Sequence, residues 1–263
     1  MKKQEDTVLM EHMTWREIRR SMENGKHTAI LVAASMEQHG PHLPIATDTI
    51  IGYALAEGVA RELGNALVAP VIRYGLSEHH VGFTGTITLP LKTFVKVVEE
   101  HCQCLRKHGF KNTVVFSSHG GNRDPLTAFI PSIAKKLSPD MRLLLVGTVG
   151  FDKNSVSRIL KEYDVSPTKA GVHAGFAETS MFLAIRPDLV RVDRIEPGLV
   201  DDDFYSEENI ERSKIFTYIH GIRPQSSNGI LGDPTGSNEE FGKALLERKI
   251  KDLTREIRLN LHE

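Results

Sequence analysis

Apolar and polar positions divide this chain into two kinds of segment. Apolar runs with little alternation occupy residues 27–35, 66–75, 113–116 and 142–150, and amphipathic segments with helical spacing occupy residues 47–64, 89–110 and 123–137. Unbroken apolar runs are typical of strands that are buried on both faces, and intervening helices favour a largely parallel sheet. The pattern therefore predicts an α/β protein whose parallel sheet is covered by helices.

The C-terminal part ends in one more predicted helix. Residues 237–263 are amphipathic with acids in the first turn, and a loop rich in glycine and proline precedes them at residues 229–237. The chain has 263 residues, of which 40% are hydrophobic, enough for one sizeable core. Without an internal repeat or a low-complexity linker, we expect residues 1–263 to form a single domain.

Composition and charge exclude several classes of protein. The chain carries 33 Lys and Arg against 34 Asp and Glu, interspersed, so no basic face for nucleic acid is expected. The apolar runs are shorter than a membrane span, and residues 1–13 lack the apolar core of a signal peptide. We therefore expect a cytoplasmic protein that has no membrane or nucleic-acid partner.

The two cysteines do not indicate a thiol site. Cys102 and Cys104 lie two positions apart in a predicted helix, so their side chains point to different faces. Neither a disulfide nor a Cys-x-x-Cys metal site is expected.

A first cluster of polar residues, SMEQHGPHLPIATD, follows the first apolar run. Glu37 and His39 project to the same side of an extended segment and could bind one ion or a close pair. Asp48 stands where the next helix begins, near the positive end of its dipole, and its carboxylate could bridge two cations. Structural alternatives stay open, because Asp48 or Thr47 could cap the helix and His42 could be a surface loop residue.

A second cluster lies within residues 75–89. It contains Ser77, Glu78, His79 and His80, and it resembles a substrate-contacting loop more than a set of metal ligands. Adjacent histidines point apart in most backbones, so at most one is expected to face a site and the other to be solvated.

A third cluster, SSHGGN, directly follows the third apolar run. His119 at the tip of a predicted buried strand is the strongest single candidate for a functional residue. Gly120 and Gly121 after it would let the backbone approach a ligand closely, although such a pair also marks any tight turn. The wider pattern of a phosphate-binding loop is missing.

The fourth cluster contains His173 and Glu178. Glu178 precedes an apolar segment that is either a buried helix or a buried strand, so its carboxylate would be costly unless paired or metal-bound. A glutamate that compensates a helix dipole is the alternative. His173 lies five residues earlier and need not share the role of Glu178.

Five of these residues form a candidate set of metal ligands: Glu37, His39, Asp48, His119 and Glu178. Carboxylate and imidazole ligands without thiolates suit zinc, manganese or iron. Five donors, one of them able to bridge, fit two ions better than one. Two adjacent divalent ions activate a shared water and polarise a carbonyl group, which is hydrolytic chemistry.

The order of these motifs resembles the creatininase (creatinine amidohydrolase) family. The resemblance runs from Thr14 to Ala244 and rests on MEQHGPHLPIATD, GLSEHHVGFTGTITL, SSHGGN, HAGFAETS and GILGDPTGS. It implies a three-layer α/β/α fold, a centre of two divalent metal ions, usually zinc or manganese, and a homo-oligomer, commonly a hexamer. By position, metal ligands of the family match Glu37, His39, Asp48 as the bridging residue, and His119; a substrate-contacting serine matches Ser77, and a proton carrier matches His173.

Two departures from creatininase proper bear on the substrate. Creatininase resembles H-Y-E-N where this chain has HGGN, so Glu178 is expected to replace the missing glutamate ligand. Creatininase also closes its pocket with tryptophans, whereas the only tryptophan here is Trp15. The HGGN form looks closer to branches that hydrolyse a formamide on a pyrimidine intermediate or trim a peptide in cofactor maturation.

We therefore predict a metal-dependent amidohydrolase that cleaves a C–N bond of a small cyclic amide or formamide. A hydroxide held between the metals and Asp48 would attack the carbonyl carbon, and His173 would return a proton to the leaving nitrogen. The predicted catalytic residues are His173 and Glu178. The predicted substrate contacts are Ser77, His80, Gly120 and Asn122.

Other functions remain as alternatives. They are a creatinine amidohydrolase, a formylaminopyrimidine deformylase, a cofactor-maturation peptidase and a catalytically silent metal-binding subunit. The presence of His173 favours an enzyme over the silent subunit. A phosphate binder is disfavoured because no lysine follows HGGN.

Overall fold

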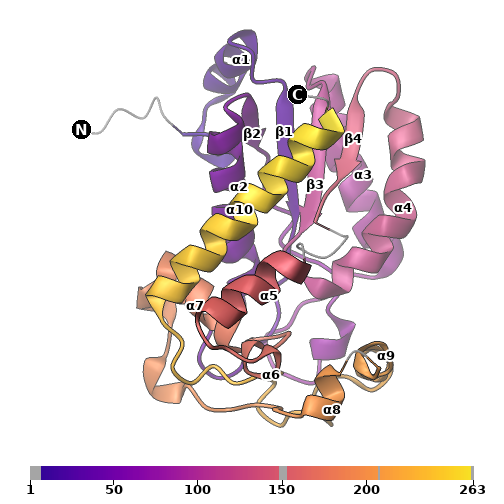
Figure 1. Ribbon diagram of the computed structural model, residues 1–263. Coiled ribbons are helices and arrows are strands. Elements are labelled where there is room, and N and C mark those ends of the chain that lie inside the picture. Colours follow the sequence, from indigo (N-terminus) through magenta and orange to yellow (C-terminus); the bar gives the residue numbers. More distant parts are fainter. Residues whose placement is uncertain (1–6, 148–152, 207, 262–263) are drawn as a thin grey trace.

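Four parallel strands form the central sheet of the protein (Figure 1). The computed structural model describes residues 7–147, 153–206 and 208–261. The sheet has the order β2-β1-β3-β4 and consists of β1 (Thr28–Ala33), β2 (Ala66–Val68), β3 (Asn112–Ser117) and β4 (Arg142–Leu145). Thr28 pairs in register with Ala66 on one side and with Asn112 on the other. The predicted parallel sheet is confirmed.

Helices surround this sheet. They are α1 (Trp15–Glu23), α2 (Thr47–Leu63), α3 (Leu91–Lys107), α4 (Arg123–Leu137), α5 (Lys153–Glu162), α6 (Pro167–Ala170), α7 (Phe176–Ile185), α8 (Asp202–Tyr205), α9 (Ile210–His220) and α10 (Glu239–Leu261). Short 3₁₀ helices are η2 (Met10–His12), η3 (Glu78–His80), η4 (Gly120–Asn122), η5 (Pro187–Leu189) and η6 (Val192–Arg194).

The sheet is covered on both faces, which explains why β1 is an unbroken apolar run. All residues of β1 are buried, and successive side chains of a strand point to opposite faces. Ile30 and Val32 pack into a core that includes residues of α2, α7 and α10, whereas Ala29 and Leu31 pack with residues of α3 and α4. The three-layer α/β/α fold is confirmed.

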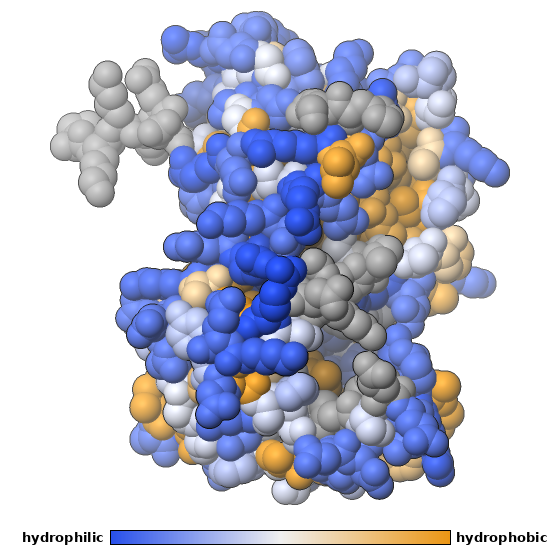
Figure 2. All heavy atoms as spheres, viewed as in Figure 1, coloured by the Kyte–Doolittle hydropathy of each residue, from blue (hydrophilic) through white to orange (hydrophobic). Residues whose placement is uncertain are grey.

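The long helix α10 runs diagonally across the near face of the molecule (Figure 1). Phe241, Leu245 and Leu253 face the core, while Lys243 and Glu247 are exposed. Figure 2 shows the result as a band of hydrophilic side chains over this helix. In the described part of the chain, no helix combines the length and apolar character needed to cross a membrane.

The second strand is shorter than the predicted residues 66–75. Regular pairing ends at Val68, because Pro70 has no amide hydrogen to donate to a neighbouring strand. The chain then rejoins β1, where the Ile72 N–H donates to the Val32 carbonyl at 3.0 Å.

Two other predicted elements extend past the described residues. Of the predicted strand 142–150, the structure shows Arg142–Leu145, and residues 148–150 lie outside the described residues. The terminal helix begins at Glu239, and residues 262–263 of its predicted range also lie outside them.

Helix α1 was not predicted, although its sequence carries a signal. The Thr14 side chain accepts a hydrogen bond from the Glu17 N–H at 3.4 Å, and the Glu17 carboxylate accepts one from the Thr14 N–H at 2.6 Å. This reciprocal capping box is written in the sequence as T-x-x-E.

The chemistry-bearing segments gather beyond the carboxyl ends of the strands. β1 leads into residues 35–48, and β3 leads into residues 118–122. This end of the sheet points downward in Figure 1, toward α6, α7, α8 and α9. The loop at Leu231 reaches the same end, where it forms a β-bridge with His173.

Candidate metal centre

The first polar cluster places three side chains together at the end of β1. Glu37 and His39 follow the strand on an extended segment, and Asp48 stands in the first turn of α2; all three are buried. His39 Nε2 lies 3.6 Å from Asp48 Oδ1. The N-cap of α2 is Ala46, and no side chain makes a cap hydrogen bond there. The alternative of Asp48 or Thr47 as an N-cap is therefore wrong, and the Asp48 carboxylate is directed into the cluster instead.

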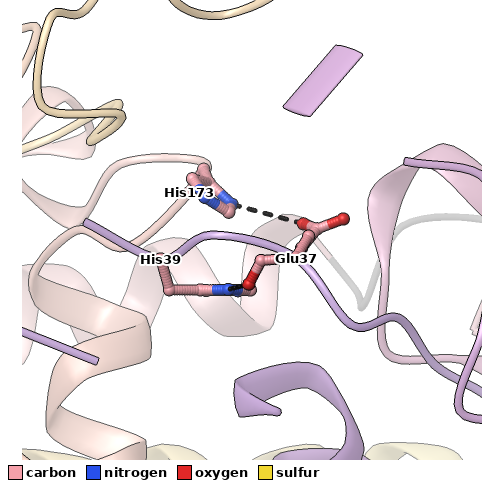
Figure 3. Close-up of side chains that lie close together, drawn as sticks. All are labelled: Glu37, His39 and His173. Atoms are coloured by element: carbon pink, nitrogen blue, oxygen red, sulfur yellow. Dashed lines mark hydrogen bonds and ion pairs between the residues drawn. The ribbon is translucent and has the colours of Figure 1, made fainter. Parts of the chain in front are cut away.

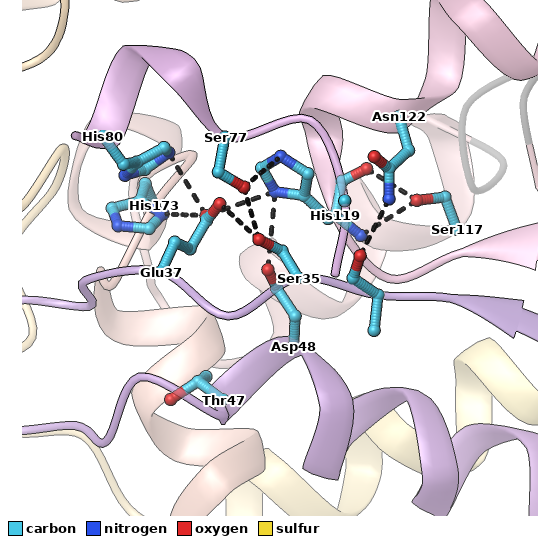
Figure 4. Close-up of polar contacts among 12 residues, drawn as sticks. Ser35, Glu37, Thr47, Asp48, Ser77, His80, Ser117, His119, Asn122 and His173 are labelled. Atoms are coloured by element: carbon cyan, nitrogen blue, oxygen red, sulfur yellow. Dashed lines mark hydrogen bonds and ion pairs between the residues drawn. The ribbon is translucent and has the colours of Figure 1, made fainter. Parts of the chain in front are cut away.

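His119 enters the same cluster from the end of β3 (Figure 4). Its Nδ1 lies 3.2 Å from Glu37 Oε1 and 3.4 Å from Asp48 Oδ2. These three residues form one group whose ligand atoms all lie within 4.8 Å of one another.

Glu178 completes a second group from the first turn of α7. Its Oε1 lies 3.6 Å from His39 Nε2, and with Asp48 these residues again bring their ligand atoms within 4.8 Å of one another. The segment that contains Glu178 is therefore a helix, and the glutamate is both at its positive end and in the cluster. Asp48 belongs to both of these groups. A third group consists of Glu37, His39 and His173, so Glu37 and His39 also each belong to two groups.

Hydrogen bonds to the backbone orient the two imidazoles. His39 Nδ1 donates to the Glu37 carbonyl at 3.1 Å, and His119 Nε2 donates to the Leu76 carbonyl at 3.0 Å. The remaining nitrogen of each neutral ring presents a lone pair to carboxylate oxygens. Carbonyl partners of this kind orient histidines that bind metals.

Lone pairs that face one another need a cation between them. Among the described residues, Glu37 Oε1, His39 Nε2 and Asp48 Oδ2 are buried atoms without a hydrogen-bond partner. Buried polar atoms in native proteins are nearly always satisfied. A proton or a metal ion would satisfy this arrangement, and its oxygen and imidazole donors fit zinc, manganese or iron.

The pKa values show which protons would occupy the cluster without a metal. Burial lowers the pKa of His39, but the carboxylates of Glu178 and Asp48 outweigh it and raise this pKa well above its ordinary value. Burial likewise opposes the charged form of His119, and Glu37 is the main cause that raises its pKa. Burial favours protonated Glu178, but His39 lowers the Glu178 pKa to about 2. A bound metal ion would take the place of the two imidazole protons.

His173 faces the same cluster from the loop before α7 (Figure 3). Its Nδ1 lies 3.7 Å from Glu37 Oε1, and its Nε2 donates to the Gln38 carbonyl at 2.7 Å. Burial and the charge of His39 lower the pKa of His173, so the neutral imidazole is favoured. Ala174 next to it has φ of 53°, and its N–H donates to Glu178 Oε2 at 2.6 Å. This left-handed turn thus directs His173 and Glu178 to one place.

The motifs that carry this geometry match a known family. The family model described as "Creatininase: Creatinine amidohydrolase" matches residues 11–257. The chain belongs to the creatininase family.

Relatives within and near this family differ in their described activities. The chain is 31% identical over 227 residues to the mycofactocin precursor peptide peptidase of Mycolicibacterium smegmatis, covering 84% of this chain and 80% of the relative. It is 28% identical to the creatinine amidohydrolase of Pseudomonas putida, covering 72% of this chain and 76% of the relative. A mutant creatininase of Zn–Zn type has the same fold, with a TM-score of 0.78 at 24% identity, covering 97% of this chain and 98% of that one. The predictions of a creatininase-family protein and of a hydrolase that acts on C–N bonds are confirmed.

The predicted substrate contacts occupy different places around the creatininase-type cluster. Ser77 is buried and its hydroxyl hydrogen-bonds the Ser35 hydroxyl. Gly120 is exposed, and open space surrounds the position that a Cβ would take. His80 is buried with its Nε2 at 3.2 Å from Glu37 Oε1. Contact of these residues with substrate stays a prediction.

Asn122 braces the backbone behind the cluster. Its Nδ2 donates to the carbonyls of Ala33 at 3.2 Å and Ala34 at 3.0 Å, and its Oδ1 accepts from the Leu76 N–H at 2.9 Å. These bonds tie the end of β1 to the segment that supplies the carbonyl partner of His119. They give Asn122 a structural role, and its predicted contact with substrate stays a prediction.

The second cluster resolves into three different environments. Glu78 is exposed and His80 is buried against Glu37. His79 is only partly exposed: its ring stacks on His119 at 5.7 Å and meets the Tyr218 ring edge-on at 4.8 Å. Both histidines therefore contact a candidate ligand, His80 beside Glu37 and His79 on the ring of His119, and the expectation that one of the two is solvated is wrong.

Two residues near the centre, Gln38 and His42, were missed or misplaced by sequence reasoning, whereas a close backbone approach at Gly121 was expected. The alternative of a surface loop position for His42 is wrong: the ring is buried, and its Nε2 lies 2.8 Å from Thr179 Oγ1. Gly121 has no room for a side chain, since a Cβ would meet His119 Nε2 at 2.5 Å. Gln38 makes the contacts described below. Only the glycine pair in HGGN signalled such a close approach in the sequence.

Proposed function

We propose that this chain is a metal-dependent amidohydrolase that holds two divalent ions, zinc as the first choice and manganese or iron as alternatives. The observation that carries the proposal is the pair of three-ligand groups that share Asp48. One group is completed by Glu37 and His119, and the other by His39 and Glu178. Their opposed lone pairs and unpartnered buried atoms support cation binding.

Two bound ions would supply an activated water and would polarise the carbonyl group of the substrate. The protein's own residues supply positioning and proton transfer. His173 is anchored through Nε2 to the Gln38 carbonyl, so its Nδ1 is directed at the cluster with a free lone pair. A neutral imidazole in this position can accept a proton and return it to a leaving nitrogen. The Ala174 N–H donates a hydrogen bond to Glu178 Oε2, which holds Glu178 Oε1 at 3.6 Å from His39 Nε2.

A small cyclic amide or a formamide is the proposed substrate, rather than creatinine itself. The only tryptophan, Trp15, lies on α1 with 63% of its surface exposed, at the opposite end of the sheet from the cluster (Figure 1). Trp15 therefore does not close the site of its own chain. Deformylation of a formylaminopyrimidine is one form of the proposal, and creatinine hydrolysis is the form that this observation disfavours.

Peptide hydrolysis is the second candidate function. The observation that favours it is the 31% identity to a precursor peptide peptidase over 84% of this chain. A catalytically silent metal-binding subunit is the alternative outside the enzymes, and the anchored position of His173 argues against it.

A hydrolysis screen tests the proposal. Creatinine, N-formylaminopyrimidines, hydantoin-like rings and short peptides would each be incubated with protein loaded with zinc, manganese or ferrous iron. We expect turnover of one class, loss of activity with a chelator, and recovery on adding metal. Creatinine turnover equal to that of the best substrate would contradict the reasoning from Trp15.

Two variants separate metal binding from catalysis. Glu37→Gln should lower metal content and activity together, because it removes a ligand charge. His173→Gln should keep the metal content and lose turnover. Full metal content in both Glu37→Gln and His119→Ala would refute the ligand assignment.

Three wider predictions accompany this function. We propose that residues 1–263 form one metallohydrolase domain, which the family match over residues 11–257 supports. A cytoplasmic location and a homo-oligomer, a hexamer by family resemblance, stay predictions. Gel filtration with light scattering would test the oligomer.

A further inference from the structure

Gln38 stands between two candidate ligands, and the sequence assigned no chemistry to it. Its side chain is buried, and both ends of the amide are in use. Oε1 accepts a hydrogen bond from the Gly40 N–H at 2.9 Å. Nε2 lies 3.0 Å from the Gly229 carbonyl and 3.1 Å from His80 Nδ1. A Cβ on Gly229 would lie 2.1 Å from Gln38 Oε1, so the loop is fitted to this side chain.

The hydrogen on His173 Nε2 determines to which acceptors the Gln38 amide donates. Its Nε2 lies 2.7 Å from the Gln38 main-chain carbonyl, which can only accept, so this nitrogen carries a hydrogen. The Gln38 amide nitrogen lies 3.0 Å from the same His173 Nε2. Because this nitrogen carries a hydrogen, it cannot accept a hydrogen bond from the amide. The two amide hydrogens are therefore donated to Gly229 and to His80 Nδ1.

This arrangement fixes the tautomer of His80. A neutral imidazole carries one hydrogen, and since Nδ1 accepts from Gln38, the hydrogen is on Nε2. Nε2 lies 3.2 Å from Glu37 Oε1, and Figure 4 shows His80 turned toward this carboxylate. The other tautomer would oppose two donors, Gln38 Nε2 and His80 Nδ1, at 3.1 Å.

We propose that Gln38 is a positioning residue that acts through His80: it holds His80 as an N–H donor on the Glu37 side of the metal centre and so keeps it out of the ligand set. With a free Nε2 lone pair, His80 would be a further ligand for an ion at Glu37. With a hydrogen on Nε2, it leaves that coordination position open, as a catalytic site requires. This consequence rests on the proposed function, whereas the tautomer itself does not.

Nitrogen NMR of the histidine side chains in zinc-loaded protein tests the tautomer directly. We expect His80 to carry its hydrogen on Nε2 and to have no metal-bound nitrogen, with His80→Gln assigning its signals and His79→Gln as the control. In Gln38→Glu, an isosteric side chain that only accepts, the hydrogen should move to Nδ1. A hydrogen on Nδ1 or a metal-bound nitrogen of His80 in the unmodified protein would overturn the proposal, as would an unchanged tautomer in Gln38→Glu.

A double-mutant cycle tests whether Gln38 acts through His80. Without the Gln38 amide, His80 is free to take the tautomer with a lone pair on Nε2 and to bind the ion as a further ligand, so Gln38→Met should strengthen zinc binding in competition with a chelator. In a His80→Phe background the same change should leave zinc affinity unchanged. Weaker zinc binding in Gln38→Met, or the same change in both backgrounds, would refute the proposal that Gln38 acts through His80. If Gln38→Glu does not fold, the His80 tautomer measured in the unmodified protein still tests the proposal. A protein that binds no zinc would end the proposed function, while the His80 tautomer would remain measurable in the metal-free protein.

Discussion

Zinc binding to the metal-free protein should release about two protons near pH 6, one from each imidazole that faces carboxylates. Zinc is added until both ligand groups are loaded. His39 and His119 carry pKa values raised well above the ordinary 6.5, so both are protonated in the metal-free protein at this pH. Each must lose its proton before its free nitrogen can bind an ion.

About two protons are expected because the other titratable groups at the centre release none near pH 6. The pKa of Glu178 is lowered to about 2, so its carboxylate is already ionised. Burial is the main cause that lowers the pKa of His79 to about 4, which leaves this ring neutral near pH 6. A pH of about 6 also keeps water on bound zinc largely protonated, since its pKa is about 7. As the pH is lowered, zinc affinity should therefore fall about tenfold per pH unit for each imidazole proton that the metal displaces.

Isothermal titration calorimetry in buffers with different ionisation enthalpies gives the proton count. His39→Gln should release about one proton fewer than the unmodified protein, and His79→Gln should release the same number as it. Zinc binding without proton release would refute the argument, as would an equal loss in both variants.

The same pKa shifts set the pH dependence of stability without metal. The raised pKa values of His39 and His119 contribute stability that is fully present below about 6.5 and is lost as the pH rises through their folded values. The lowered pKa of Glu178 contributes stability that is present above about 4.5 and is lost as the pH falls toward its folded value of about 2. The metal-free protein should therefore melt at a lower temperature in alkaline buffer, and zinc should remove this loss.

Three substitutions test the packing and the ligand set. Gly121→Ala should lower Tm and zinc content, because the new Cβ would meet His119 Nε2 at 2.5 Å and overpacking costs about 1–3 kcal/mol. Glu178→Gln should leave about one zinc per chain by metal analysis, because it removes a ligand from only one of the two groups. Thr179→Val should destabilise the protein by about 1–3 kcal/mol in urea unfolding, because it leaves the buried His42 Nε2 without its partner.

Matched controls make these results interpretable. Gly120→Ala introduces a Cβ into open space and should leave Tm unchanged, so an equal loss from both glycines would contradict the packing argument. Thr127→Val removes an exposed hydroxyl that bonds only its own helix, and it should cost far less than Thr179→Val. Retention of both ions in Glu178→Gln would exclude this glutamate from the ligand set.

Local pattern predicted the elements that carry the candidate ligands. The apolar run of β1 and the helical spacing of α2 follow from the side-chain periods of strands and helices, and these periods are visible in the sequence. Glu37, Asp48 and His119 could be selected because each stands next to the end of such an element. The segment after Glu178 was ambiguous, because a short apolar run fits a buried helix and a buried strand equally well.

The sequence by itself thus determined the fold class and which residues could bind metal. Only the tertiary structure decided that Glu37 lies with His119, that His39 lies with Glu178, and that Gln38 directs His80. The reason is that the spacing of apolar residues in one segment indicates only whether that segment is a strand or a helix and which of its faces is buried. The direction of a histidine lone pair depends instead on a carbonyl or amide that another segment supplies. Such partners, separated along the chain, meet only when the loops pack together beyond the same end of the sheet.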